Sequence, residues 1–192
     1  MIFNEKQLNV SNKYKFVWWA PERTASRTVA EILSYYGFTC DGLPIYQFGE
    51  FSHRHTCYLT NGIQEYHIIC GARNPYDRTL SIFKNFFQSN EDKTVLNFQN
   101  FIKNKLESDP ILNMIQRPIF VKIPNYIIKL ESLKEDIMKL PFINDVLTER
   151  QIDLILMHDK PKRDWESYYD EETKKIVYKY TRHHFDIFGY ER

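Results

Sequence analysis

The chain has 192 residues, of which 43% are hydrophobic and 27% are charged, with six glycines and eight prolines. This composition excludes a disordered or fibrous protein, and the length suits one domain with a substantial core. The formal net charge of +1 excludes a molecule-wide field that would attract nucleic acid or an anionic membrane. We therefore expect a single globular domain over residues 1–192, in which any anion site is formed locally.

The sequence also shows neither a targeting signal nor a disulfide framework. Residues 1–16 contain no apolar stretch typical of a signal peptide, and the chain has no apolar run of about 18 residues. The three cysteines, Cys40, Cys57 and Cys70, are odd in number and lack metal-ligand spacing, which favours reduced thiols. We expect a cytoplasmic protein without a membrane span, from a bacterial or viral source.

The first predicted unit is a strand, a turn and a helix. Residues 14–19 are an apolar and aromatic run that is typical of a buried strand. Residues 27–36 repeat apolar side chains at helical spacing, and Gly37 is placed to end that helix. This order of elements indicates the opening of an α/β nucleotide-binding unit.

A second unit repeats this order. Residues 67–72 are apolar throughout instead of alternating, which predicts a strand inside a parallel sheet. Residues 73–77 then form a turn, and residues 78–88 form a helix. The intervening residues 38–65 are irregular, and a loop of that length in a compact domain is often functional.

The rest of the chain continues the alternation of strands and helices. Ser132 and Glu135 have the spacing of a capping box, and Asp170 and Gly189 suit the two ends of the last helix. We therefore predict an α/β fold with a central parallel sheet flanked by helices. The predicted elements are a helix over 94–106, a strand over 126–130, and helices over 133–140, 149–157 and 171–188.

The turn of the first unit has the composition of a phosphate-binding site. Its residues 21–28 are Pro-Glu-Arg-Thr-Ala-Ser-Arg-Thr, and they lead from a buried strand into a helix N-terminus. Backbone N–H groups at a helix start point at a bound anion, and the helix dipole favours its charge. The Gly-x4-Gly-Lys pattern of a Walker A motif is missing. Serine and threonine are also common at helix starts for capping alone, so both interpretations stay open.

The turn of the second unit places an arginine at a strand end and a serine in the following helix. Arg73 and Ser81 lie eight residues apart, with Pro75 between them. An arginine fork and a hydroxyl are suitable ligands for a phosphate monoester, and a kink at Pro75 would bring them close. In the alternative interpretation, Arg73 and Arg78 pair with local carboxylates such as Asp77.

These segments resemble those of the sulfotransferases that use 3′-phosphoadenosine-5′-phosphosulfate (PAPS). Residues 73–81 match the family's 3′-phosphate pattern R-x-P-x-x-R-x-x-S, and residues 21–28 are similar to its 5′-phosphosulfate loop. Residues 125–133 resemble a later strand and helix start, and residues 168–191 resemble the C-terminal helix of the carbohydrate branch. The resemblance implies a P-loop-NTPase-like sulfotransferase fold, PAPS as donor, PAP as product, and no metal.

The resemblance also implies the cofactor-binding residues. Alignment on Thr24-Ala25-Ser26 places Arg23 at the family's loop lysine and Ala25 at its loop glycine. Arginine stays charged and offers a fork, so it can hold the bridging oxygen but does not readily donate a proton. The implied set is Arg23, Thr24, Ala25, Ser26, Arg27 and Thr28 at the 5′-phosphosulfate, Arg73 and Ser81 at the 3′-phosphate, and Lys160, Lys162 and Arg163 in a basic flap over the nucleotide.

A base for the acceptor hydroxyl is expected in the irregular segment 38–65. Histidine suits proton transfer at neutral pH, and His53 and His55 resemble the His-x-His element of the uronyl 2-O-sulfotransferase branch. We expect His55 to be the base and His53 to bind substrate, with Glu50 and His67 as the next candidate bases. The alternative is that both histidines are surface or structural residues.

Two other functions fit parts of the sequence. A P-loop-like kinase would transfer phosphate from ATP, but it predicts a lysine in the first turn and acidic Mg²⁺ ligands at a strand end. A non-catalytic nucleotide- or glycan-binding module on the same fold would tolerate arginine in place of the loop lysine. For the transferase, the expected acceptor is a hydroxyl of a glycan or glycolipid; no nucleic-acid partner is expected, and the oligomeric state is left open.

Overall fold

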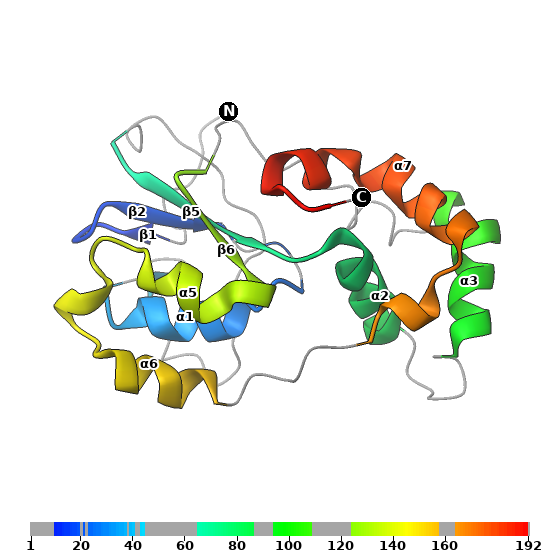
Figure 1. Cartoon of the computed structure of the whole chain (residues 1–192). Coiled ribbons are helices and arrows are strands. Elements are labelled where there is room, and N and C mark those ends of the chain that lie inside the picture. The colour runs from blue at the N-terminus through cyan, green and yellow to red at the C-terminus, as the bar shows by residue number, and fades with distance from the viewer. Residues whose placement is uncertain are drawn as a thin grey trace. The chain divides into compact units, whose positions relative to one another are not determined.

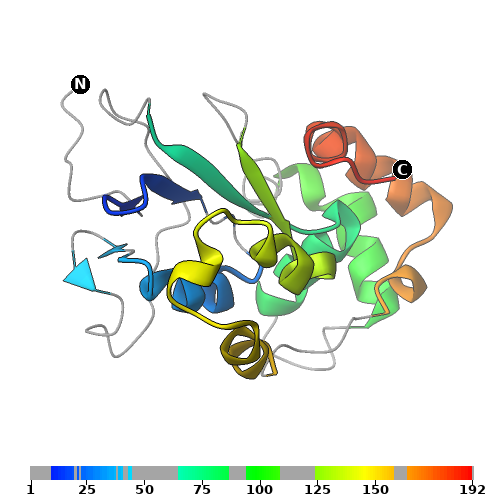
Figure 2. The ribbon, with the colours of Figure 1, turned by 60° about the vertical axis from the view of Figure 1, so that its left-hand side comes forward.

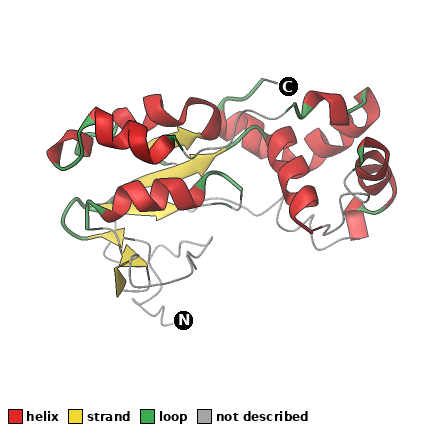
Figure 3. Cartoon of the chain, turned by 90° about the horizontal axis from the view of Figure 1, so that it is seen from below, coloured by secondary structure: helices red, strands yellow, loops and turns green. Residues whose placement is uncertain are grey.

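The chain divides into two compact units. Unit 1 comprises Met1–Ala72 and Phe120–Lys160, and unit 2 comprises Arg73–Ile119 and Pro161–Arg192. Among the described residues every strand belongs to unit 1, and unit 2 is built from helices (Figure 3). The predicted single domain over residues 1–192 stays a prediction. The structure is a computed structural model that describes residues 10–19, 21, 23–37, 39–40, 43–44, 65–86, 94–108, 124–157 and 164–191.

Unit 1 is organised around a sheet with parallel central strands. The strand order is β4-β3-β1-β2-β5-β6. Strands β2, β5 and β6 run parallel, whereas β1 pairs antiparallel with β2 and β3, and β3 pairs antiparallel with β4 (Figure 1). The predicted α/β class and parallel strands are confirmed. The strands are β1 (Val10–Ser11), β2 (Phe16–Trp19), β3 (Thr39–Cys40), β4 (Leu43–Pro44), β5 (His67–Ala72) and β6 (Tyr126–Lys129).

The register of the parallel strands fixes where their carboxyl ends lie. Trp19 is opposite Cys70, and Ala72 is opposite Lys129, so β2, β5 and β6 all end at one edge of the sheet. All of β2 is buried, as is β5 after His67, which is typical of strands inside a parallel sheet. Ligands of open α/β sheets bind outside the carboxyl ends of the strands, so this edge is where a site is expected.

Three helices lie on one side of this sheet, the third of them packed against the first two (Figures 1 and 2). Because side chains alternate along a strand, Phe16 and Trp18 of β2 point to the same face. They share a core with Ile32, Ile137 and Ile152, one from each helix. These helices are α1 (Ser26–Ser34), α5 (Leu133–Met138) and α6 (Glu149–Leu156), and short 3-10 turns lie at η5 (Leu130–Ser132) and η6 (Ile143–Asp145).

Unit 2 has an aromatic core between three helices. The rings of Phe83 and Phe98 meet edge to face with centroids 5.2 Å apart, and those of Tyr76 and Phe185 do so at 5.1 Å. This geometry adds to the free energy gained from apolar burial. The helices are α2 (Pro75–Phe86), α3 (Val95–Asn104) and α7 (Glu171–Phe188), with 3-10 turns at η4 (Leu106–Ser108) and η7 (Glu166–Tyr168).

The predicted ends of the last helix are confirmed. The Asp170 carboxylate accepts a 2.8 Å hydrogen bond from the Thr173 N–H, and the Thr173 hydroxyl accepts one from the Asp170 N–H at 3.0 Å. Gly189 ends the helix with φ 63°, a left-handed conformation that glycine adopts without steric cost.

Helix α2 begins earlier than predicted. It starts at Pro75 instead of residue 78, because Asn74 caps it: the Asn74 side-chain oxygen accepts the Tyr76 N–H at 2.9 Å. Proline suits the first helical position, where its missing N–H has no intrahelical partner to lose. The turn predicted over residues 73–77 is therefore too long, since Pro75 already opens the helix.

The capping box predicted at Ser132 is also wrong. Its side chain makes no capping bond to the helix backbone; instead, its hydroxyl donates to the buried Asp136 carboxylate at 2.7 Å. Asp136 also accepts the Lys129 N–H at 3.0 Å and the Lys139 ammonium at 2.6 Å. Burial alone would raise the pKa of Asp136, but these three donors outweigh it and lower the pKa. The Ser132 hydroxyl is thus turned toward the Asp136 carboxylate and does not accept an N–H of the helix start.

Tyr36 joins the end of α1 to the segment after α5. It is buried, its hydroxyl donates to the Ile143 carbonyl, and the same oxygen accepts the Leu147 N–H at 3.2 Å. Burial is the main cause that raises the pKa of Tyr36. One phenol therefore satisfies two buried backbone groups that lie more than a hundred residues further along the chain.

We predict that Tyr36→Phe lowers the free energy of unfolding by about 1–3 kcal/mol, because it leaves a buried carbonyl and a buried N–H without their partner. Urea unfolding followed by circular dichroism measures the change. Tyr35→Phe is the matched control, since Tyr35 is exposed and its change should stay within about 0.5 kcal/mol. Equal effects of the two substitutions would contradict the role given to Tyr36.

Candidate functional site

The turn between β2 and α1 has a left-handed backbone at the helix start. Ala25, the N-cap residue of α1, has φ 56° and ψ 27°, and Ser26 is the first helical residue. Consecutive left- and right-handed residues point their N–H groups toward a common centre and form an anion-binding nest, as in phosphate loops. In unit 1 the nest therefore coincides with the N-terminus of a nine-residue helix, where the dipole also favours an anion.

Two residues of this turn have a strained backbone. Arg23 has φ 66° and Ala25 has φ 56°, and a left-handed conformation costs a residue with a Cβ about 1–2 kcal/mol. Such strain is concentrated at ligand-binding segments, where the surrounding structure enforces it. A left-handed φ such as that of Ala25 is one that glycine adopts without steric cost.

The charges of this turn favour an anion. The first turn of α1 has no acidic side chain, while Arg23 and Arg27 are exposed. Cations near a helix N-terminus are disfavoured by the dipole, so an anion at the nest would improve the electrostatic energy of the whole turn. Of the other predicted ligands, Ser26 is buried and Thr28 is half-buried.

Thr24 holds the turn against β5. It is buried, and its hydroxyl donates to the Pro21 carbonyl at 2.7 Å, so its donor supports the turn itself. Gly71 of β5 makes this approach possible: a Cβ there would lie 2.7 Å from the Thr24 Oγ1 and 3.0 Å from the Trp18 Cη2. The sequence reasoning missed Gly71, although a single glycine inside an apolar strand is the usual signal of close backbone approach.

In unit 2, Arg73 follows β5 directly and pairs with Asp77. The guanidinium Nε donates to the Asp77 Oδ2 at 2.7 Å, and the Nη2 lies 2.7 Å from the Oδ1. Both side chains are about nine-tenths buried. The local ion pair given above as the alternative is therefore present, as one hydrogen bond from Nε to Oδ2 and a second ion contact between Nη2 and Oδ1, which has no hydrogen-bond partner among the described residues.

Ser81 lies on the same face of α2 as this ion pair. Asp77 and Ser81 are four residues apart in α2, which places their Cβ atoms about 5–6 Å apart. Ser81 therefore lies one helical turn beyond the residue that holds Arg73, and its pairing with Arg73 at a phosphate stays a prediction. Ser81 is fully buried. Arg78, three residues before Ser81, is buried as well.

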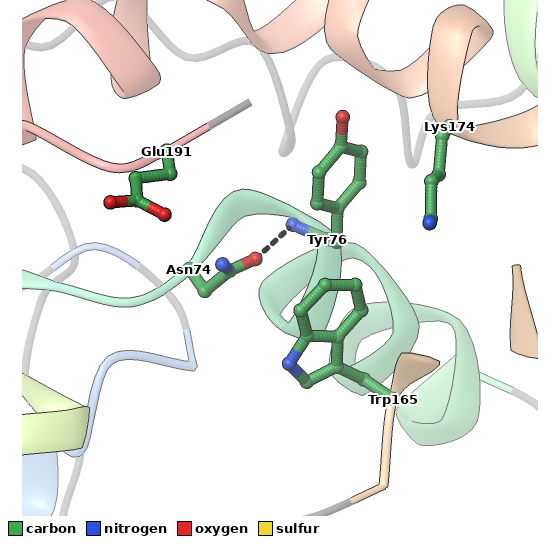
Figure 4. A pocket seen from close by; sticks show the side chains of 5 residues that line it. All are labelled: Asn74, Tyr76, Trp165, Lys174 and Glu191. Carbon is green, nitrogen blue, oxygen red and sulfur yellow. Dashed lines mark hydrogen bonds between the residues drawn. The ribbon is translucent and has the colours of Figure 1, made fainter. Parts of the chain in front are cut away.

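A small pocket opens beside the start of α2 (Figure 4). Its volume is about 250 Å³, and the rings of Tyr76 and Trp165 stack with centroids 5.4 Å apart and planes 21° from parallel. Lys174 lies on one side of these rings, and Asn74 and Glu191 lie on the other. Burial raises the pKa of Tyr76. Such a lining suits a small ring with a hydrogen-bonding group.

Several predicted site residues lie outside the described residues. This holds for the expected base His55, its neighbour His53 and the alternative Glu50, and for the basic flap residues Lys160, Lys162 and Arg163. Cys40 is described only as strand backbone, and Cys57 is outside as well. Cys70 is a buried thiol in no disulfide, as expected for a reduced cysteine, and it donates to the Gly71 carbonyl at 3.2 Å.

His67 is described, and its place argues against a role at the α1 turn. It is the first residue of β5, whereas the turn lies at the carboxyl edge. Five strand steps separate it from Ala72, which amounts to about 17 Å. The His67 ring is exposed and meets Tyr126 edge to face at 5.7 Å.

No family model, curated protein or solved structure matches the chain. Among the described residues, no group of three or more His, Cys, Asp or Glu side chains is placed to hold a metal ion. In the same part of the chain, every helix is too short or too polar to cross a membrane.

We predict that Ala25→Gly raises the free energy of unfolding by about 0.5–1 kcal/mol. Glycine relieves the left-handed strain of the folded state, and this gain exceeds the extra conformational entropy that glycine loses on folding. Ala30→Gly in the same helix should lower it by about 1 kcal/mol, since Ala30 is an ordinary buried residue of α1. Thermal and urea unfolding measure both changes. If Ala25→Gly destabilises as Ala30→Gly does, the left-handed turn is refuted.

Proposed function

We propose that the protein is a PAPS-dependent sulfotransferase that moves a sulfuryl group to a hydroxyl of an acceptor. The nest at Ala25 and Ser26 supports this most directly, because it follows a buried parallel strand and opens a helix without acidic residues in its first turn. This combination favours a phosphate-type anion at the carboxyl edge of the sheet.

The roles proposed for the two turns follow from their chemistry. The α1 turn would bind the 5′-phosphosulfate through backbone N–H groups, with Arg23 stabilising charge on the bridging oxygen. Arg73 and Ser81 would bind the 3′-phosphate, which supplies a second anion that a fork and a hydroxyl can distinguish. The basic residues Lys160, Lys162 and Arg163 would add contacts from the flap.

The charges at the strand ends favour PAPS over ATP. A kinase needs carboxylates there to hold Mg²⁺, but β5 is followed by Arg73, and the nearest carboxylate, Asp77, is occupied by that guanidinium. At the end of β6, the Asp136 carboxylate is occupied by Lys129, Ser132 and Lys139, but Glu131 also follows β6 and Glu22 follows β2 in the sequence. The preference for a bisphosphate nucleotide over a metal-bound triphosphate therefore rests on Arg73 at the end of β5.

The proposed transfer needs positioning and one base. The acceptor oxygen attacks sulfur, the bond between sulfur and the bridging phosphate oxygen breaks, and PAP leaves with the electron pair. The acceptor proton passes to His55, the proposed base, and His53 would bind the acceptor. The acceptor is proposed to be a glycan or glycolipid on the strength of the C-terminal resemblance.

Isothermal titration with PAP and with ATP tests the donor. We expect PAP to bind more tightly than ATP, and Arg73→Ala to weaken PAP by about 10- to 100-fold because it removes charge-assisted bonds. Arg182→Ala is the matched control: it also breaks an Arg–Asp pair four residues apart, but an exposed one on α7. No PAP binding by folded protein would refute the proposal, and tighter ATP binding would favour the kinase.

PAP release from PAPS in the presence of a panel of glycans tests turnover. We expect His55→Ala to lower the rate by about 100-fold or more, the usual cost of losing a base, without changing the dissociation constant of PAP. His67→Ala should leave the rate unchanged, since His67 lies at the opposite sheet edge. PAP binding without transfer to any hydroxyl would identify a non-catalytic nucleotide-binding module instead.

A further inference from the structure

We infer that Asp77 is a positioning residue that orients the Arg73 guanidinium toward a phosphate monoester, an inference that rests on the proposed function. Asp77 makes two contacts of 2.7 Å with Arg73, one to Nε and one to Nη2. One hydrogen bond and a second ion contact with the same carboxylate hold the guanidinium at two points, which restricts its rotation. Single-point pairing would leave that plane free to rotate.

The start of α2 does not need the Asp77 carboxylate as a cap. Asn74 already accepts the N–H groups of Tyr76 and Asp77, at 2.9 and 3.4 Å, and its carbonyl accepts the Arg78 N–H at 2.8 Å. Pro75 has no N–H to satisfy. The local backbone donors are thus provided for, and the carboxylate is directed to the guanidinium.

Stability alone is a weak reason to bury this pair. Desolvating two charges offsets most of their attraction, and apolar residues of similar volume often stabilise a protein as well or better. The core of unit 2 beside it is rich in aromatic side chains and has no shortage of apolar packing. A buried pair at a strand end where ligands bind is better explained by the orientation that it gives to Arg73.

The spacing along α2 supports the same role. Asp77 stands four residues before Ser81, so the carboxylate that holds the guanidinium and the buried serine hydroxyl lie on one helix face. A phosphate monoester accepts hydrogen bonds from both kinds of group. The carboxylate itself repels the phosphate, so positioning and repulsion predict opposite effects for a variant that removes only its charge.

The test compares PAP with adenosine 5′-monophosphate, which lacks only the 3′-phosphate. The ratio of their dissociation constants isolates the contribution of that phosphate. We expect Asp77→Asn to reduce the preference for PAP by about tenfold, by analogy with partners that orient metal ligands, and to leave monophosphate binding unchanged. Asp186→Asn is the matched control, because it removes the carboxylate of the exposed pair with Arg182 and should change neither constant.

Each outcome has a separate meaning. If wild-type protein shows no preference for PAP, the proposed function fails before Asp77 is tested. If the preference exists but Asp77→Asn leaves it unchanged or increases it, or weakens both nucleotides equally, the positioning role is overturned. If Asp77→Asn does not fold, Arg73→Lys is the decisive variant, because it keeps the charge but loses the guanidinium fork. An undiminished preference of Arg73→Lys for PAP would show that the orientation of the fork does not matter, and it would overturn the positioning role of Asp77.

Discussion

The parallel pairing of β2 and β5 is the constraint on which the rest of unit 1 depends. It brings the ends of both strands to one edge of the sheet and sets Trp19 opposite Cys70. The α1 turn can then lie over β5 only where a side chain is missing, which is at Gly71 beside Thr24 and Trp18. Strand β5 thus contains a glycine because the neighbouring turn requires the space. Glycine is unfavourable inside a strand, but here it allows the close contact with Thr24.

The same turn shows how the chain maintains a strained backbone. Arg23 and Ala25 both have positive φ, and neither is a glycine. The turn is held in place by the Thr24 hydroxyl on the Pro21 carbonyl and by the helix that Ser26 begins. Strain that is imposed from both sides keeps the N–H groups aimed before any anion arrives, so a ligand would not have to order them.

The sequence predicted elements with strong apolar patterns and missed features that depend on competing side chains. The strand at residues 67–72 and the two caps of α7 were predictable, because a continuous apolar run and the residues at Asp170 and Gly189 leave little choice. Ser132 was misassigned because its hydroxyl donates to Asp136, four residues further on, and is turned away from the helix backbone. At the candidate site, the spacing from Arg73 to Ser81 was visible, but spacing cannot show that Asp77 engages the guanidinium with both oxygens.

The two turns hold their cations in different ways, and this difference has consequences for anion binding. Arg23 and Arg27 are exposed, so water stabilises their charge and dissolved salt screens it over about 8–10 Å. Arg73 is buried, and a buried guanidinium without a carboxylate would be costly, which makes Asp77 a condition for having a cation at that strand end at all. An anion at the α1 turn would therefore compete with bulk ions, whereas an anion at Arg73 would meet a guanidinium that salt screens weakly but that Asp77 partly neutralises. With a net charge of +1, any selectivity of the chain for an anion would come from these local arrangements and not from its overall field.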